Sequence, residues 1–97
     1  MIPVNFKVGK FYQAVIPQIF TYSKASKVLF RLKNLTYLKG NDQVEVPEAT
    51  YEGGNELVLH IEILKEDPYE ASNHLGGSMN AGFFEDVIEV PHLHLVT

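Results

Sequence analysis

The 97-residue chain contains no cysteine. It therefore has no disulfide framework, no thiolate nucleophile and no cysteine-based zinc site. Its longest apolar runs are three or four residues, far below the roughly 20 that a membrane-spanning helix needs. The N-terminal MIPVNFKVGK lacks a basic region followed by an apolar stretch, so no secretory signal is expected. These absences favour a cytoplasmic protein without a membrane partner, placed in the host cytoplasm or the virion if the chain is viral.

Motifs for catalysis are missing as well. The sequence has no glycine-rich phosphate loop of the Walker or dinucleotide type and no Gly-x-Ser-x-Gly elbow. Glu85 and Asp86 are adjacent, so on a regular strand they would face opposite ways and could not act as one dyad. We therefore expect neither an enzyme nor a cofactor.

What is present predicts one mainly β domain spanning residues 1–97. The composition, 45% hydrophobic and 21% charged, is that of a globular chain. Within Glu56–Glu66 the odd positions are apolar over four successive repeats, which is typical of a half-buried strand. Gln43–Tyr51 is interpreted as its hairpin partner, joined through the paired glycines Gly53 and Gly54. A second turn is expected at residues 39–42, so the three segments around these turns predict an antiparallel meander.

Three further segments have features that interrupt or complicate the strand pattern. Val4–Ile16 is interpreted as a strand bent at Gly9 and ended by Pro17, and Phe83–Val96 as a strand cut by Pro91. Lys27–Lys39 fits a strand through its alternation and its aromatic residues. An amphipathic helix around residues 23–38 is the alternative, which would make the domain α+β.

The expected architecture is a small five-stranded antiparallel barrel or sandwich. An oligonucleotide-binding (OB-like) barrel is one fold of this kind. In length and layout the chain is similar to small phage single-strand-binding proteins, although no motif in it fixes a family. Binding of single-stranded DNA is what that resemblance implies, and a viral origin is suggested by the small size of the chain.

Charge is segregated along the chain. The first 41 residues hold seven basic side chains and no carboxylate, whereas residues 42–97 hold all twelve carboxylates and one lysine. The net charge of −4 is thus +7 for one part and −11 for the other (7 − 11 = −4). Such asymmetry points to polyanions as partners of the basic part and to basic surfaces as partners of the acidic part.

The leading functional hypothesis is binding of single-stranded nucleic acid by the basic, aromatic N-terminal region. Cations neutralise phosphates, and aromatic rings stack on bases. If Lys27–Lys39 is a strand, its basic residues and Tyr37 would project from one face. The predicted nucleic-acid-binding residues are Lys10, Tyr12, Lys24, Lys27, Arg31, Lys33, Tyr37 and Lys39. The acidic net charge opposes this hypothesis, because nucleic-acid-binding domains are commonly basic.

Two alternatives stay open beside it. The charge dipole could drive docking onto another protein, as a phage-type structural component, an inhibitor of a host nucleic-acid enzyme, or a homo-oligomer. The two parts could instead neutralise each other within one fold, through cross-strand pairs that fix register.

The histidines form a weaker candidate site. His92 and His94 have strand spacing and would aim two imidazoles to one side, with His60 or His74 as a third ligand. Two such histidines are more often solvated than metal-bound, so no metal site is predicted.

Overall fold

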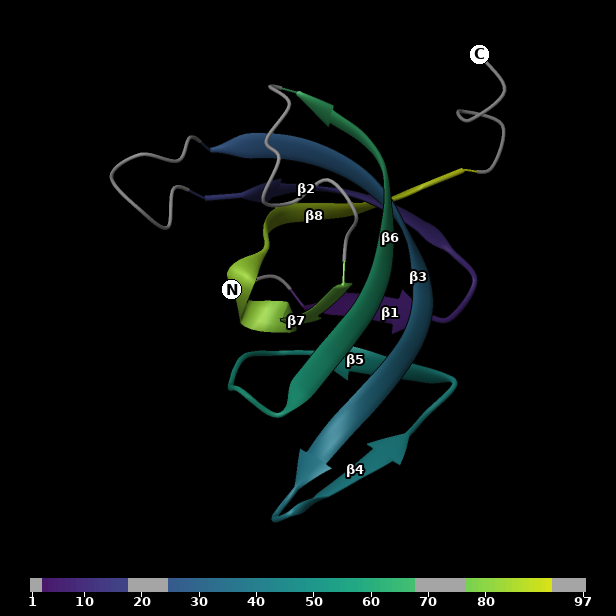
Figure 1. Cartoon of the computed structure of the whole chain (residues 1–97), viewed down its shortest axis with the longest axis vertical. Helices are drawn as coiled ribbons and strands as arrows, with labels where there is room; N and C mark the ends of the chain where they lie inside the picture. The colour runs from purple at the N-terminus through teal and green to yellow at the C-terminus, as the bar shows by residue number, and fades with distance from the viewer. Residues whose placement is uncertain (1–2, 18–24, 68–76, 92–97) are drawn as a thin grey trace.

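Antiparallel strands form nearly all of the regular structure (Figure 1). The computed structural model describes residues 3–17, 25–67 and 77–91, and the structural statements below concern these residues. Their elements are β1 (Val4–Lys7), β2 (Phe11–Ile16), β3 (Ser26–Lys39), β4 (Asp42–Glu45), β5 (Glu48–Tyr51), β6 (Leu57–Asp67), β7 (Gly77–Asn80), the 3₁₀ helix η1 (Ala81–Phe83) and β8 (Glu85–Val90). No helix among the described residues is long and apolar enough to cross a membrane.

The mainly β class and the antiparallel pairing are confirmed, but the number of strands is not. Among the described residues, eight strands replace the expected five, because a glycine and a proline divide two of the expected segments and β7 forms in what was expected to be a connection. Gly9 separates β1 from β2, and Pro47 lies between β4 and β5. The strands of the described part form no closed barrel.

β3 is the central strand, and the helical alternative for this segment is wrong. It runs for 14 residues and pairs with β2, β6 and β4. Figure 1 shows β3 and β6 as two long curved strands lying side by side. Alternation of apolar residues over residues 28–32, together with aromatic and β-branched side chains, favours the extended conformation that these ladders stabilise.

The strands form two sheets. The larger has the order β7-β6-β3-β2-β8, with β4 also paired to β3, and the smaller consists of β1 and β5. Residues 81–84 connect β7 to β8, the two outermost strands of that order. Four linking residues span no more than about 18 Å, so the larger sheet must curl until these two edges approach each other.

Gly9 carries the chain from the smaller sheet to the larger one, as the predicted bend requires. Its φ of 92° lies in the left-handed region that favours glycine. Its N–H donates to the carbonyl of Leu32 at 2.8 Å, and the Leu32 N–H donates to the carbonyl of Lys10 at 3.0 Å. These hydrogen bonds place the corner directly on β3.

The expected meander is only half correct. Lys39 and Asp42 face each other across the β3–β4 turn, where Gly40 has a φ of 64°, so this hairpin is confirmed. The hairpin around Gly53 and Gly54 is wrong, because β5 pairs with β1 whereas β6 pairs with β3. Those glycines turn the chain between sheets instead of folding one strand back onto its neighbour.

A register shift in β3 between Leu32 and Asn34 changes which residues face the core. Before it, Val28 and Leu32 are buried; after it, Leu35 is buried and Tyr37 packs against the core. Such a bulge inserts one residue and reverses the alternation beyond it. The expected single face carrying Lys27, Arg31, Lys33, Tyr37 and Lys39 is therefore wrong.

A chain of aromatic rings forms the centre of the core. Ring centroids lie 5.2 Å apart for Phe6 and Tyr12, 5.7 Å for Tyr12 and Phe30, and 5.2 Å for Phe30 and Phe84. These rings come from β1, β2, β3 and the residue that follows η1. The core therefore joins both sheets and the link between β7 and β8.

Candidate functional site

The fold interleaves the basic and acidic parts of the sequence. Four basic residues lie opposite acidic residues in the strand registers: Lys7 opposite Glu48, Lys27 opposite Asp67, Arg31 opposite Glu62, and Lys39 opposite Asp42. In one of these pairs the Arg31 Nε lies 3.3 Å from Glu62 Oε1. An exposed ion pair such as that of Arg31 and Glu62 contributes only about 0.2–1 kcal/mol. Opposite charges that face each other across a ladder favour its register, which agrees with the intramolecular interpretation of the charge pattern.

The two tyrosines predicted to stack on bases do not lie on the basic surface. Tyr12 is 0% exposed and belongs to the aromatic core, so it cannot stack on a base in this structure. Tyr37 is half-buried and packs against the same core. Lys24 lies outside the described residues.

Lys10 and Lys33 are the described basic site residues that face no carboxylate in the strand registers, and their backbones lie close to each other at Leu32. Lys10 is held beside Leu32 by the hydrogen bonds at the Gly9 corner, and Lys33 follows Leu32 at the bulge. Both are exposed. The half-buried Phe11 lies next to Lys10 in the chain and opposite Arg31 in the ladder. In the described part, these residues form the basic corner, defined as Lys10, Phe11, Arg31 and Lys33.

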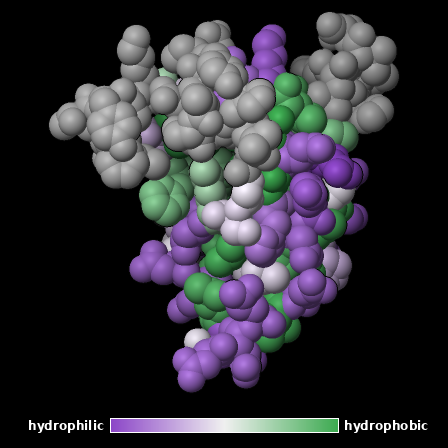
Figure 2. All heavy atoms as spheres, in the orientation of Figure 1, coloured by the Kyte–Doolittle hydropathy of each residue, from purple (hydrophilic) through white to green (hydrophobic). Residues whose placement is uncertain are grey.

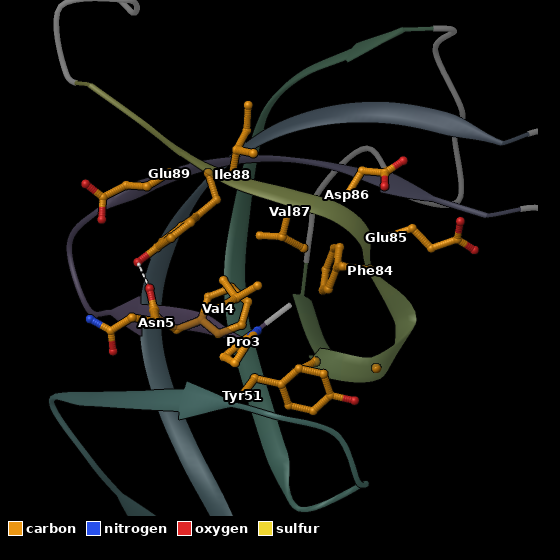
Figure 3. Close-up of a pocket in the computed structure, with 14 residues that line it drawn as sticks. Pro3, Val4, Asn5, Tyr51, Phe84, Glu85, Asp86, Val87, Ile88 and Glu89 are labelled. Carbon is orange, nitrogen blue, oxygen red and sulfur yellow. Dashed lines mark hydrogen bonds between the residues drawn. The ribbon is translucent and has the colours of Figure 1, made fainter. Parts of the chain in front are cut away.

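A hollow lies elsewhere, between β1, β5, η1 and β8 (Figure 3). It has a volume of about 840 Å³. The side chains of Val4, Tyr51, Phe84 and Val87 point into it, so its interior is largely apolar. On the face shown in Figure 2, by contrast, hydrophobic residues are interspersed with hydrophilic ones over the described part. We call this hollow the β1–β8 groove.

The rim of the β1–β8 groove is acidic. Glu85, Asp86 and Glu89 line it, and no lysine, arginine or histidine is among the described residues that do so. In Figure 3 the carboxylates of Glu85 and Asp86 extend outward from the rim. The groove therefore combines an apolar interior with a single sign of charge at its mouth.

Both Glu85 and Asp86 line the groove because β8 is irregular there. Val15 faces Glu85 and Gln13 faces Ile88, so β8 contains an extra residue between these pairs. Asp86 accommodates it with a φ of 52°, and Asp is one of the few non-glycine residues that adopt this conformation readily. Alternation on a regular strand predicted opposite faces, and nothing local in the sequence marks the bulge.

Tyr12 forms part of the groove's inner wall. Its hydroxyl accepts a hydrogen bond from the Lys7 N–H at 2.7 Å and donates one to the Asn5 carbonyl at 3.3 Å. Burial raises the pKa of Tyr12, and the nearby Glu89 carboxylate acts in the same direction, while the hydrogen bond from Lys7 opposes both. The phenol thus bridges β2 to the side of β1 that faces away from β5.

The histidine hypothesis is not resolved by the described residues. His74, His92 and His94 lie outside them. In His60, Nδ1 lies 2.7 Å from the Ser78 hydroxyl and Nε2 lies 3.1 Å from the Thr36 hydroxyl, so both ring nitrogens are engaged. No group of three or more potential metal ligands occurs in the part of the chain that the structure describes.

The chain was compared with known proteins as a whole. No family model, no curated protein and no solved structure matches it.

Proposed function

We propose that this chain is a non-catalytic binding domain that docks onto another protein through the β1–β8 groove. One observation carries the proposal: an apolar hollow of about 840 Å³ is bordered along β8 by three carboxylates, and no lysine, arginine or histidine is among the described residues that line it. Concave, mostly apolar sites with a few placed polar groups are typical of binding sites. Charge of one sign at such a site steers and selects the partner.

Exposed apolar side chains beside the groove favour a macromolecular partner. Ile88 on β8 is 57% exposed, and Phe83, which directly precedes the groove residue Phe84, is 46% exposed. Contiguous apolar surface rimmed by polar residues marks contact sites between proteins, and these two side chains would extend the apolar surface of the groove for such a partner. Assembly through a charge dipole is not included in the proposal, because the two parts of the sequence interleave in the sheets.

The test selects peptides from a random library on the immobilised protein and asks where they bind. We expect selected peptides to lose at least tenfold in affinity for a Val87→Asp variant, because an additional carboxylate would enter the apolar interior. Val44→Asp on β4 is the matched control, since Val44 is 44% exposed and lies outside the groove. Fluorescence anisotropy measures the affinities, and circular dichroism verifies that both variants are folded.

Val87→Thr provides a nearly isosteric second variant if Val87→Asp fails to fold. Peptides that bind both Val87 variants and the control equally would place the contact outside the groove and overturn the proposal. Failure to select any peptide with the native protein would also count against it.

The basic corner favours nucleic-acid binding as a second candidate function. Its support is that Lys10 and Lys33 are exposed beside Phe11 and have no facing carboxylate in the described registers. Cations next to a flat ring are the combination that single strands require. Against it, the other described cations predicted for the site lie opposite acidic residues.

Replacing Lys10 and Lys33 together by alanine should then reduce the salt dependence of single-strand binding. Each lost phosphate contact lowers the slope of log K against log salt by about 0.7, so two contacts amount to about 1.4. Anisotropy of a labelled 20-mer, titrated at several salt concentrations, measures this slope. The control variant Lys39→Ala/Lys65→Ala has the same net charge as Lys10→Ala/Lys33→Ala and should change the salt slope less. Equal slopes for the two double variants would show that the basic corner does not bind the strand.

A further inference from the structure

The wall of the β1–β8 groove on the β8 side is formed by the edge of a strand. Five consecutive residues, 85–89, line the groove. A strand that presents one face to a hollow contributes every second side chain, because successive side chains point to opposite faces. The bulge accounts for Glu85 and Asp86, but Val87, Ile88 and Glu89 beyond it also line the groove in succession. This succession indicates that the edge of β8, with its backbone, borders the groove. In the described sheet β8 is an outermost strand and pairs only with β2.

The opposite wall, formed by β1, differs because the Tyr12 hydroxyl is hydrogen-bonded to backbone groups of that strand. Residues 3–6 also line the groove consecutively, so β1 borders it by an edge as well. There, however, the Tyr12 hydroxyl binds the Lys7 N–H and the Asn5 carbonyl, and the Lys7 carbonyl accepts from the Lys10 N–H at 3.2 Å. Of the two edges, only that of β8 has no such cap among the described residues.

Charge determines which strand could pair with this edge. Carboxylates and bulges on edge strands discourage pairing with another copy of the same chain. Two β8 edges placed side by side would bring together Glu85, Asp86 and Glu89 from each copy. The same carboxylates would attract lysine or arginine side chains, so the rim excludes a second β8 edge and admits a basic segment.

We propose that the groove takes an extended basic segment of a partner protein, which adds as a strand to the edge of β8 and places an apolar side chain against Phe84 and Val87. This inference rests on the proposed docking function and names its partner and its mode. Strand addition obtains affinity from backbone hydrogen bonds and specificity from alternate side chains in pockets. The apolar interior and the acidic rim supply those two kinds of side-chain contact.

The paired segment is short. The bulge at Asp86 interrupts β8 at one end, and Pro91, which has no N–H, follows Val90 at the other. Regular register with β2 covers Ile88 to Val90. Together with Val87, about four residues of β8, or about 13 Å of strand, are available to pair with an added segment.

The experiment titrates the full chain into a fluorescein-labelled heptapeptide of alternating lysine and valine, at 50 and 200 mM salt. Two derivatives carry N-methyl groups on alternate amides, one at the lysines and one at the valines. In an added strand, alternate N–H groups point to the same edge, so only one of the two sets of amides can donate hydrogen bonds to β8. We therefore expect the derivative that is methylated on that set to lose at least tenfold in affinity and the other derivative to bind like the parent. A heptapeptide with glutamate in place of lysine should bind at least tenfold more weakly than the parent.

Protein variants test the rim with matched charge. Glu85→Gln/Glu89→Gln should weaken binding of the lysine peptide at least fivefold and reduce its salt dependence. Glu52→Gln/Glu56→Gln removes two exposed carboxylates outside the groove and should leave binding nearly unchanged. Equal effects of the two double variants would overturn the assignment of the basic segment to this rim.

The outcomes separate the mode of binding from the docking function. If both N-methylated peptides bind like the parent while the rim variant weakens binding, strand addition is wrong and docking in the groove stands. If no lysine peptide binds at 50 mM salt, the inference is overturned, and the library selection with the Val87 variants decides the docking function separately.

Discussion

Phe30→Ala is expected to remove a large part of the stability of the domain. Phe30 is 0% exposed, and its ring lies 5.7 Å from that of Tyr12 and 5.2 Å from that of Phe84. Truncating a buried phenylalanine costs about 3–5 kcal/mol, from lost burial and from the cavity that remains. Because native domains are stable by only about 5–15 kcal/mol, this variant should unfold under mild conditions.

Urea and thermal denaturation followed by circular dichroism measure this effect. For a domain of this size each kcal/mol shifts Tm by about 4–8 °C, so a decrease of at least about 12 °C is expected. Leu38→Ala on the same strand is the control, because Leu38 is 38% exposed and lies outside the core. A loss below about 1 kcal/mol for Phe30→Ala would show that this ring does not have the central position described here.

Tyr12→Phe is expected to have the second-largest effect, although it removes a single oxygen atom. That oxygen accepts from the Lys7 N–H and donates to the Asn5 carbonyl, so its loss leaves two partly buried backbone groups without this partner. Leaving a buried donor or acceptor unsatisfied costs about 1–3 kcal/mol. Chemical denaturation at pH 8 measures the difference. Tyr37→Phe is the matched control, since the Tyr37 ring packs against the core without a described hydrogen bond of its hydroxyl.

The contribution of the Tyr12 hydroxyl should also depend on pH. Burial, with a further contribution from Glu89, raises the pKa of Tyr12 above its usual value of 10.0. The folded state therefore favours the protonated phenol more than the unfolded state does. Its contribution is fully present below pH 10 and is lost as pH rises through the folded-state pKa. The stability difference between native protein and Tyr12→Phe should shrink above pH 10, and a constant difference between pH 8 and 11 would contradict this assignment.

Local pattern in the sequence predicted most of the extended segments and the hairpin at residues 39–42, but not the other strand pairings. Alternation in residues 57–63 and the glycine at position 9 are signals within a few residues, and both were interpreted correctly. Gly53 and Gly54 also resemble a hairpin turn locally. Whether the strands on either side pair with each other depends on competition from β1 and β3, which are distant in sequence, so the local signal was insufficient.

The candidate site was harder to predict because bulges invert the faces of strands. A single extra residue near Lys33 moved Tyr37 to the core side, and another at Asp86 placed neighbouring carboxylates on one rim. The groove itself is assembled from β1, β5, η1 and β8, which are remote from one another in the chain. The charge segregation left two interpretations open, separate charged surfaces or neutralisation within one fold. The sequence could not decide between them, because the answer depends on which strands pair, and the antiparallel registers bring basic and acidic residues opposite each other.

The pairing of β2 with β8 has a consequence for biosynthesis. Phe11 faces Val90 in that ladder, so two partners are separated by 79 positions (90 − 11 = 79). Chains leave the ribosome at about 5–20 residues per second, so β2 waits several seconds before its second neighbour exists. During that interval β2 can pair with β3, while its other edge remains open to incorrect partners. Since β8 forms one wall of the groove, a nascent chain cannot engage a partner there until synthesis has passed this last described strand.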